Sequence, residues 1–377
     1  MKLLTIIGAR PQIIKAAAIS RAIQGLYADE ISEILVHTGQ HYDQNMSEVF
    51  FNELNIPQPD YNLGIGSMHP AVQTAKMIDA IFGVLEKEEP NWLLVYGDTN
   101  STLAGSLAAN KAEIPLIHIE AGLRSYNKSM PEENNRIVAD HFSTLLFCPT
   151  QTAEENLRKE GFFINTIPEF HIDRPGIFNC GDVMYDNSKF FGDLAENKQS
   201  LLEKNSLKEN QFIFFTCHRP VNTDVKENLS SIFRACLQLA DRGEEIFMPL
   251  HPRTIKALEQ RAPAILEELN SHENIVVHPP VSFLEISLLE KKCKMVITDS
   301  GGVQKEAFFF KKPCLVLRDE TEWVELVESG SAILVGANTE KIVEQFEVLM
   351  SKTLSFPQIF GRGNAAEIIC ERILESS

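Results

Sequence analysis

Residues 295–309 read MVITDSGGVQKEAFF and carry the clearest structural signal in the chain. The apolar run 295–298 predicts a buried strand, Asp299-Ser300-Gly301-Gly302 predicts a tight turn, and the residues from Val303 onward predict a helix. Strand, glycine turn and helix in this order form the beginning of a parallel α/β unit. The free N–H groups and the positive dipole end of such a helix bind phosphate. The segment therefore predicts both a parallel sheet and an anion site.

Short apolar runs alternate with longer helix-periodic segments along the rest of the chain. Runs rich in Val, Ile, Leu and Phe are typical of parallel strands that helices cover on both faces. The predicted strands are residues 3–7, 33–37, 92–96, 116–120 and 145–148 in the first half, and 212–216, 245–250, 275–278, 295–298, 314–317 and 332–335 in the second. Helices are predicted between them, for example at residues 12–23, 72–85 and 102–110. The fold class is therefore α/β, with two Rossmann-like doubly wound domains.

The length of 377 residues fits two such domains of about 150 to 200 residues each. Residues 162–180 contain Pro168 and Pro175-Gly176 and show no clear periodicity, which predicts a linker. We expect residues 1–170 to form the first domain and residues 171–359 the second. The C-terminal residues 360–377 are expected to return to the first domain as a helix.

Composition and net charge restrict the binding partners and the cellular compartment that we expect for the protein. The net charge of −17 argues against a broad surface for nucleic acid or anionic lipid. No apolar run approaches the roughly 18 residues of a membrane span, and the apolar start reaches Gly8 too soon for a signal peptide. The seven cysteines are scattered and never spaced as C-x-x-C, which is typical of reduced thiols. We expect a cytoplasmic protein that binds neither nucleic acid nor membrane.

Polar residues directly follow the predicted strands in both halves. Ligands bind beyond the carboxyl ends of the strands in an open parallel sheet. Any one of these residues could be a helix cap or a buried ion pair, but together they predict a ligand site in a cleft that both domains face. The segments are Arg10, residues 37–41, 97–100 and 120–124 in the first half, and residues 218–219, 251–253, 299–302 and 318–322 in the second.

The glycine turn at residues 300–302 is the predicted phosphate site, with the alternative that Asp299 or Ser300 only caps the following helix. Glu306, one turn into that helix, is placed to accept hydrogen bonds from ribose hydroxyls. Arg10 and Lys15, around the first strand-to-helix turn, are predicted to reach the pyrophosphate, and the alternative for Lys15 is a solvated side chain.

Other cofactor motifs do not fit the sequence. The glycine-rich segment at Gly64 lacks the third glycine of a dinucleotide fingerprint, and the one at Gly361 lies too near the C-terminus to open a βαβ unit. The Walker pattern is absent, and His37 with His41 lacks the glutamate of the metalloprotease motif. We therefore expect neither a bound cofactor nor a metal.

Nine short segments, in one order over almost the whole chain, together resemble a known family. They read Gly8-Ala-Arg-Pro-Gln, His37-Thr-Gly-Gln-His, Tyr96-Gly-Asp-Thr-Asn-Ser-Thr, Glu120-Ala-Gly-Leu-Arg-Ser, Met130-Pro-Glu-Glu-Asn-Asn-Arg, His218-Arg, His251-Pro, Asp299-Ser-Gly-Gly-Val-Gln-Lys-Glu and Arg318-Asp-Glu-Thr-Glu. This set resembles the non-hydrolysing UDP-N-acetylglucosamine (UDP-GlcNAc) 2-epimerases, whose two domains are GT-B-like.

The resemblance implies a reaction, a set of site residues and an assembly. The reaction is the reversible inversion of carbon 2, by elimination of UDP to 2-acetamidoglucal and re-addition of UDP, in a homodimeric enzyme. The residues implied for catalysis are Asp98, Glu120, Glu132 and His218. The residues implied for contacts with UDP or the sugar are Arg10, Lys15, His251, Arg253, Ser300, Gly301, Gly302, Glu306 and Arg318.

Departures from the family pattern leave the substrate open. Ala9 stands where the family usually has threonine, and the loop at residues 125–130 is shorter than in enterobacterial-type members. The loop is closer to a branch that includes epimerases of UDP-2,3-diacetamido-2,3-dideoxyglucuronic acid, which is the first alternative substrate. The sequence is also compatible with a hydrolysing epimerase that releases free N-acetylmannosamine, with a glycosyltransferase, and with a non-catalytic binding protein.

Overall fold

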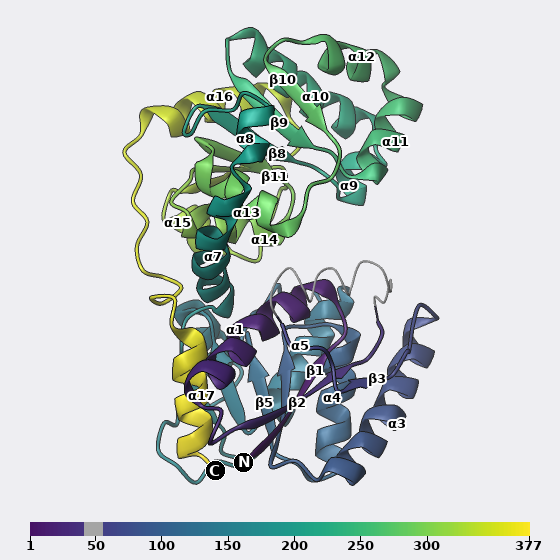
Figure 1. The fold of residues 1–377 in the computed structure, drawn as a ribbon, viewed down its shortest axis with the longest axis vertical. Helices are drawn as coiled ribbons and strands as arrows, with labels where there is room; N and C mark the ends of the chain where they lie inside the picture. The colour runs from purple at the N-terminus through teal and green to yellow at the C-terminus, as the bar shows by residue number, and fades with distance from the viewer. Residues whose placement is uncertain (41–55) are drawn as a thin grey trace. The chain divides into compact units, whose positions relative to one another are not determined.

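The computed structural model describes residues 1–40 and 56–377, and these residues form two compact units (Figure 1). The first unit contains Met1–Asn187 and Gln358–Ser377, and the second contains Ser188–Pro357. The chain therefore crosses between the units twice, after Asn187 and after Pro357.

The first unit is built on a parallel sheet with the strand order β3-β2-β1-β4-β5-β6-β7 among the described residues. Its strands are β1 (Lys2–Ile7), β2 (Ser32–His37), β3 (Tyr61–Asn62), β4 (Trp92–Tyr96), β5 (Leu116–Ile119), β6 (Leu145–Cys148) and β7 (Gly176–Asn179). Its helices are α1 (Arg10–Leu26), α3 (Pro70–Glu88), α4 (Asn100–Lys111), α5 (Pro131–Phe142), α6 (Gln151–Lys159) and α17 (Ala365–Glu375). Helix α7 (Val183–Leu194) runs across the boundary between the units.

The C-terminal helix α17 packs against α1 within the first unit (Figure 1). The carboxylate of Asp186 accepts hydrogen bonds from the N–H groups of Ala365 and Ala366, at 3.1 and 2.8 Å. These are free N–H groups of the first helical turn, so the carboxylate caps α17.

The second unit is also a parallel sheet, with the strand order β10-β9-β8-β11-β12-β13. Its strands are β8 (Phe212–Thr216), β9 (Glu245–Pro249), β10 (Ile275–His278), β11 (Met295–Thr298), β12 (Cys314–Val316) and β13 (Ala332–Leu334). Its helices are the 3₁₀ turn η1 (Ala195–Lys198), α8 (Ser200–Lys204), α9 (Pro220–Thr223), α10 (Lys226–Asp241), α11 (Pro252–Arg261), α12 (Pro263–Ser271), α13 (Phe283–Lys292), α14 (Gly301–Phe309), α15 (Val324–Glu328) and α16 (Thr339–Ser351).

Strand burial and strand order confirm the predicted fold class of two Rossmann-like doubly wound sheets. Every residue of β4, β6 and β11 is buried, as expected for strands that helices cover on both faces. In each sheet the first strand lies inside: β1 lies between β2 and β4, and β8 lies between β9 and β11. The order reverses at these points, where such sheets bind ligands beyond their carboxyl ends.

The prediction of a linker at residues 162–180 is wrong. These residues include β7, which pairs in parallel with β6 at the edge of the first sheet. A proline and a glycine suit a short edge strand as well as they suit a linker. Here Gly176 also avoids a clash, because a Cβ atom would lie 2.9 Å from the ring of Phe178. The boundary between the units accordingly falls after Asn187 instead of residue 170.

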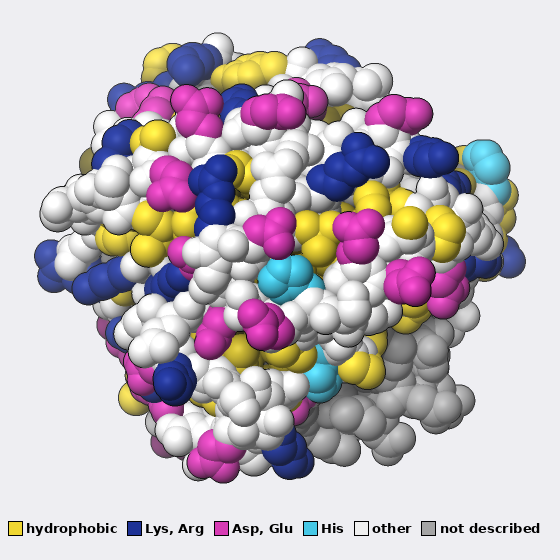
Figure 2. Space-filling view, turned by 90° about the horizontal axis from the view of Figure 1, so that it is seen from above, with side chains coloured by type: hydrophobic (Ala, Val, Ile, Leu, Met, Phe, Trp, Pro, Cys, Tyr) yellow, Lys and Arg dark blue, Asp and Glu magenta, His cyan; other side chains and the backbone are white. Residues whose placement is uncertain are grey.

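Charged side chains of both signs are mixed on the face of the molecule that Figure 2 shows, where Lys and Arg do not gather into one basic stripe. Among the described residues, no helix is long and apolar enough to cross a membrane.

We predict that Gly122→Ala strongly destabilises the first unit. Gly122 has a φ of +77°, and an added Cβ atom would lie 2.3 Å from the carbonyl oxygen of Ala153. Left-handed strain with a backbone clash should lower the free energy of unfolding by about 3 kcal/mol in urea titrations. Gly83→Ala, at an open position within α3, should instead raise it by about 0.5 to 1 kcal/mol. Equal stability of the two variants would contradict this account.

Candidate active site

Asp98 lies in the turn after β4, and α5 holds it in place. Its carboxylate forms a short ion pair with the guanidinium of Arg136, while the side-chain amide of Asn135 donates to the Asp98 carbonyl at 2.9 Å. The Asp98 side chain is 34% exposed and that of Arg136 only 8%. A buried cation thus orients a carboxylate that solvent or a ligand can still reach.

Glu120 directly follows β5 and adopts a left-handed φ of 71°, which is uncommon for a residue other than glycine. Its carboxylate pairs with the ammonium of Lys15 from α1, and both side chains are largely buried. A Cβ atom on Gly97 would lie 3.0 Å from Glu120 Oε2 and 3.1 Å from Lys15 Nζ. The turn that carries Asp98 therefore passes directly over the Lys15–Glu120 pair.

Glu132 and its neighbour Glu133 differ sharply in surroundings within the first turn of α5. Glu132 is exposed, whereas Glu133 is buried and accepts hydrogen bonds from the backbone N–H groups of Ser125 and Tyr126, each at 2.9 Å. Glu133 thus holds the loop before α5, and Glu132 is available to a ligand.

A fully buried histidine and aspartate connect the turns after β4 and β5. His118 Nε2 lies 2.8 Å from the carbonyl oxygen of Gly97, and His118 Nδ1 lies 2.7 Å from Asp140 Oδ1. Asp140 also accepts from the N–H of Gly122 at 3.2 Å and pairs with Arg124 at 2.7 Å. Burial alone would raise the pKa of Asp140, but its contacts with His118 and Arg124 outweigh burial and lower it. One carboxylate therefore fixes the backbone beside both Asp98 and Glu120.

In the second unit, the turn after β11 leads directly into helix α14. Ser300 is the N-cap of α14, and its Oγ accepts from the N–H of Val303 at 3.5 Å. Gly302 is exposed, and a Cβ atom on Gly301 would lie 2.4 Å from Glu322 Oε1. The helix start is therefore open on one side and closely packed on the other.

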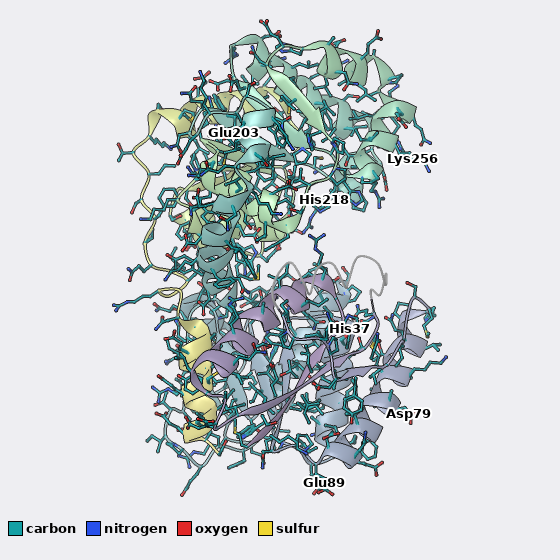
Figure 3. All side chains as sticks on the ribbon, in the orientation of Figure 1. His37, Asp79, Glu89, Glu203, His218 and Lys256 are labelled. Carbon is teal, nitrogen blue, oxygen red and sulfur yellow. The ribbon has the colours of Figure 1, made fainter. Side chains whose placement is uncertain are left out.

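Asp299 holds the neighbouring turn instead of capping α14, so of the two residues in the capping alternative only Ser300 caps that helix. Its buried carboxylate accepts from the N–H groups of His218 and Arg219 at 3.0 and 2.8 Å, and from the side-chain amide of Asn222 at 3.0 Å. The His218 ring lies at the end of β8, with its side chain 45% exposed (Figure 3).

Two further predicted residues of the second unit lie near His218 or near the short helix α9 that follows it. The rings of His218 and His251 lie 6.2 Å apart between centroids. Burial, followed by the charges of His218 and Arg253, lowers the pKa of His251. Arg253 pairs with Asp224 at 2.6 Å.

Two further predicted ligands have ion-pair partners within the protein. Arg318 pairs with Glu322 at 2.9 Å. The solvated alternative for Lys15 is wrong, because its ammonium is paired with Glu120. Arg10 begins α1 and is exposed, and Glu306 is 8% exposed.

Residues 1–40 and 56–377 contain no group of three or more His, Cys, Asp and Glu side chains that could hold a metal ion. His41, four residues after His37, lies outside the described residues.

Comparison with known proteins places the chain in a family. The profile described as UDP-N-acetylglucosamine 2-epimerase matches residues 25–374. The chain belongs to the UDP-GlcNAc 2-epimerase family. The resemblance inferred from the nine sequence segments is thereby confirmed.

Individual members of the UDP-GlcNAc 2-epimerase family align over nearly their full length. A UDP-GlcNAc 2-epimerase homolog of Methanococcus maripaludis is 46% identical, covering 98% of this chain and 99% of the relative. The UDP-2,3-diacetamido-2,3-dideoxy-D-glucuronate 2-epimerase of Pseudomonas aeruginosa is also 46% identical, with the same coverage. The UDP-GlcNAc 2-epimerase of Methanocaldococcus jannaschii, solved in complex with UDP-GlcNAc and UDP, is 40% identical with a TM-score of 0.84 over 100% of both chains.

Three residues that organise the first unit's carboxylates were not singled out from the sequence of this family member. They are Arg136, His118 and Asp140. Arg136 closes the quoted segment that begins at Met130, and its place four residues after Glu132 puts both on one side of α5. His118 lies inside the buried strand β5. In the sequence, a single histidine within such an apolar run has the pattern of an ordinary core residue. Asp140 shows no signal in the sequence alone.

We predict that Asp140→Asn lowers the free energy of unfolding by about 3 kcal/mol at neutral pH, because it leaves His118 buried without its carboxylate and leaves the buried Arg124 guanidinium with Glu160 in place of two carboxylate partners. The wild-type carboxylate has a lowered pKa. Its stabilisation is therefore present above the ordinary pKa of aspartate and is lost as the pH falls through the folded-state pKa.

Urea titrations at neutral and acid pH test this prediction. The difference between wild type and Asp140→Asn should shrink in acid. Glu154→Gln, which breaks the surface pair with Arg158, should change stability by about 0.5 kcal/mol or less. A neutral-pH loss for Asp140→Asn as small as that of the surface variant would contradict the anchoring role.

Proposed function

We propose that the protein inverts carbon 2 of UDP-GlcNAc to give UDP-N-acetylmannosamine (UDP-ManNAc), without releasing free sugar. The observation that carries the proposal is the arrangement in the first unit of two carboxylates around Gly97, each with its own cation. Asp98 pairs with Arg136, and Glu120 pairs with Lys15. Family membership supports the same reaction class.

The chemistry explains why carboxylates and a phosphate site are both needed. The hydrogen on carbon 2 does not adjoin a carbonyl group, so direct removal of this proton is prohibitive. When the bond between carbon 1 and the UDP oxygen breaks, positive charge at carbon 1 makes that proton acidic. A base takes the proton, the electron pair forms the double bond of 2-acetamidoglucal, and UDP departs. Protonation of carbon 2 from the other face and return of the UDP oxygen to carbon 1 give the epimer.

Asp98 and Glu120 are the proposed acid and base. Removal and return of a proton on opposite faces require at least two proton-transfer groups. The ion pairs with Arg136 and Lys15 fix both carboxylates before substrate arrives, which lowers the cost of orienting them during the reaction. Glu132, exposed in the first turn of α5, is the third candidate.

The second unit is proposed to hold the nucleotide. The free N–H groups at the start of α14 would bind the diphosphate, and the exposed His218 would stabilise the negative charge that builds on departing UDP. We assign Glu306 to the ribose hydroxyls, and Arg10, Lys15, His251, Arg253 and Arg318 to contacts with the nucleotide or the sugar. Because Lys15, Arg253 and Arg318 already have carboxylate partners, such contacts would share or exchange those partners.

A second substrate has specific support. The relative named as a UDP-2,3-diacetamido-2,3-dideoxy-D-glucuronate 2-epimerase is 46% identical, against 40% for the M. jannaschii UDP-GlcNAc 2-epimerase. Incubation with each nucleotide in turn, followed by chromatographic separation of the UDP-sugars, decides between them. Conversion of UDP-GlcNAc to UDP-ManNAc supports the proposal, and conversion of only the diacetamido-uronate supports the second substrate. Release of free N-acetylmannosamine would mean a hydrolysing enzyme.

We predict that Asp98→Asn and Glu120→Gln each lower turnover at least about 100-fold, which corresponds to about 3 kcal/mol of activation free energy. Calorimetry should still detect UDP binding, because the proposed nucleotide contacts lie mainly in the second unit. Asp79→Asn, a matched change at an exposed position of α3, should retain wild-type turnover. Wild-type turnover in Asp98→Asn or Glu120→Gln would remove that residue from the mechanism.

A further inference from the structure

The segment that follows β12 lies along the first turns of α14. The hydroxyl of Thr321 donates a hydrogen bond to the side-chain oxygen of Gln304 at 2.8 Å. The ammonium of Lys305 lies over the ring of Trp323, with Nζ 3.8 Å from the ring centroid. The side chains of Gln304, Lys305 and Trp323 are buried. Two contacts with α14 therefore fix the backbone on either side of Glu322.

The carboxylate of Glu322 bridges a guanidinium and the start of α14. Its Oε2 accepts a hydrogen bond from Arg318 Nη1 at 2.9 Å. Its Oε1 lies against Gly301, where an added Cβ atom would clash with it. Because one carboxylate makes both contacts, the cation of Arg318 is held beside Gly301, the first residue of α14.

The surroundings of Glu322 favour its ionised form. Burial alone would raise the pKa of Glu322, but the charge of Arg318, with hydrogen bonds to the carboxylate, outweighs burial and lowers it. The side chain of Glu322 is 27% exposed and that of Arg318 only 10%. Salt screens a pair shielded in this way far less than a surface pair. The ion pair is therefore in place before any ligand binds.

We propose that Glu322 is a positioning residue of the nucleotide site: it holds the Arg318 guanidinium beside the start of α14, where that cation binds the diphosphate of UDP. This inference rests on the proposed function, which assigns the diphosphate to the same helix start. A guanidinium has five N–H donors in a fixed fork, so Arg318 keeps its bond to Glu322 while its other donors bind phosphate. Arg318 thus shares its partners and does not exchange them.

Glu322 has two effects on UDP binding, and they oppose each other. Without an acceptor at position 322, the long side chain of Arg318 must be ordered each time UDP binds, which lowers affinity. The negative charge of Glu322, in contrast, repels a diphosphate. Two neutral substitutions separate these effects. Glutamine keeps an acceptor oxygen for Arg318, whereas methionine, of similar length, has no oxygen acceptor and no charge.

The test is calorimetric titration of UDP into Glu322→Gln and Glu322→Met, after thermal unfolding has shown that both variants fold. Because both are neutral, the acceptor is their main difference, and Glu322→Met should bind UDP about tenfold more weakly than Glu322→Gln. Glu322→Gln should bind at least as tightly as wild type, since it keeps the acceptor and loses the repulsion. Equal affinity of the two variants, or weaker binding by Glu322→Gln than by wild type, would overturn the role of Glu322.

The same pair of substitutions in an Arg318→Met background shows whether Glu322 acts through Arg318 or only supports the fold. No guanidinium then remains to be oriented, so the glutamine and methionine variants should agree within about twofold. The N–H groups of α14 should keep UDP binding measurable. A glutamine-to-methionine difference as large as in the Arg318 protein would mean that Glu322 acts independently of Arg318, which contradicts the proposal.

Glu320 provides a matched control, because it is exposed and lies two positions earlier in the same segment. Glu320→Gln and Glu320→Met should bind UDP equally. If their affinities differed as much as those of the two variants at position 322, the effect would not depend on the contact with Arg318 and the proposal would fail.

These outcomes separate the inference from the proposed function. Failure of wild type to bind UDP would contradict the proposed function, whereas UDP binding by wild type with equal affinity in the two neutral variants overturns only the role of Glu322. If a variant at position 322 does not fold, Arg318→Lys provides the test. An ammonium lacks the fork that holds Glu322 and phosphate together, so UDP should bind about tenfold more weakly. Wild-type affinity in Arg318→Lys would then overturn the proposal.

Discussion

The buried carboxylate of Asp140 is the constraint on which the first unit's site depends. Parallel strands end in turns that are free to vary, and the groups proposed for catalysis lie in two such turns. Asp140 fixes one turn through His118 and the carbonyl of Gly97, and the other through the N–H of Gly122. Arg124 balances the charge at the centre of this network. The positions of Asp98 and Glu120 thus follow from buried groups that never need to touch substrate.

In the second unit, a buried carboxylate also holds a turn after a strand. The buried carboxylate of Asp299 holds the N–H groups of His218 and Arg219, which leaves the His218 ring exposed and the start of α14 open. Buried carboxylates therefore orient the exposed polar groups in both units.

Local signals in the sequence were sufficient for the fold class. Buried strands such as Trp92–Tyr96 and Met295–Thr298 are continuous apolar runs, and the structure has strands at those residues. The edge strand Gly176–Asn179 was missed because four residues beside a proline and a glycine carry too weak a pattern. Some predicted strands also end at a different residue from the observed ones. The strand predicted at residues 116–120 ends before Glu120, because the positive φ of Glu120 takes it out of the β region.

Motifs identified the residues of the candidate site but not their pairing. The Lys15–Glu120 contact joins residues 105 positions apart, and the Arg136–Asp98 contact joins residues 38 apart. Such pairs depend on how helices cross the sheet, which residue spacing does not encode. The distinction between Glu132 and Glu133 likewise arises from the loop that folds over α5, since both lie in its first turn.

The central claim is that inversion proceeds by removal and return of the proton on carbon 2. Proton NMR of the purified protein with UDP-GlcNAc in heavy water tests this claim most directly. The account predicts that UDP-ManNAc appears with deuterium at carbon 2 and without free N-acetylmannosamine. Formation of UDP-ManNAc that retains the original hydrogen at carbon 2 would contradict the account, because the proton would then never have passed to the acid and base groups of the site.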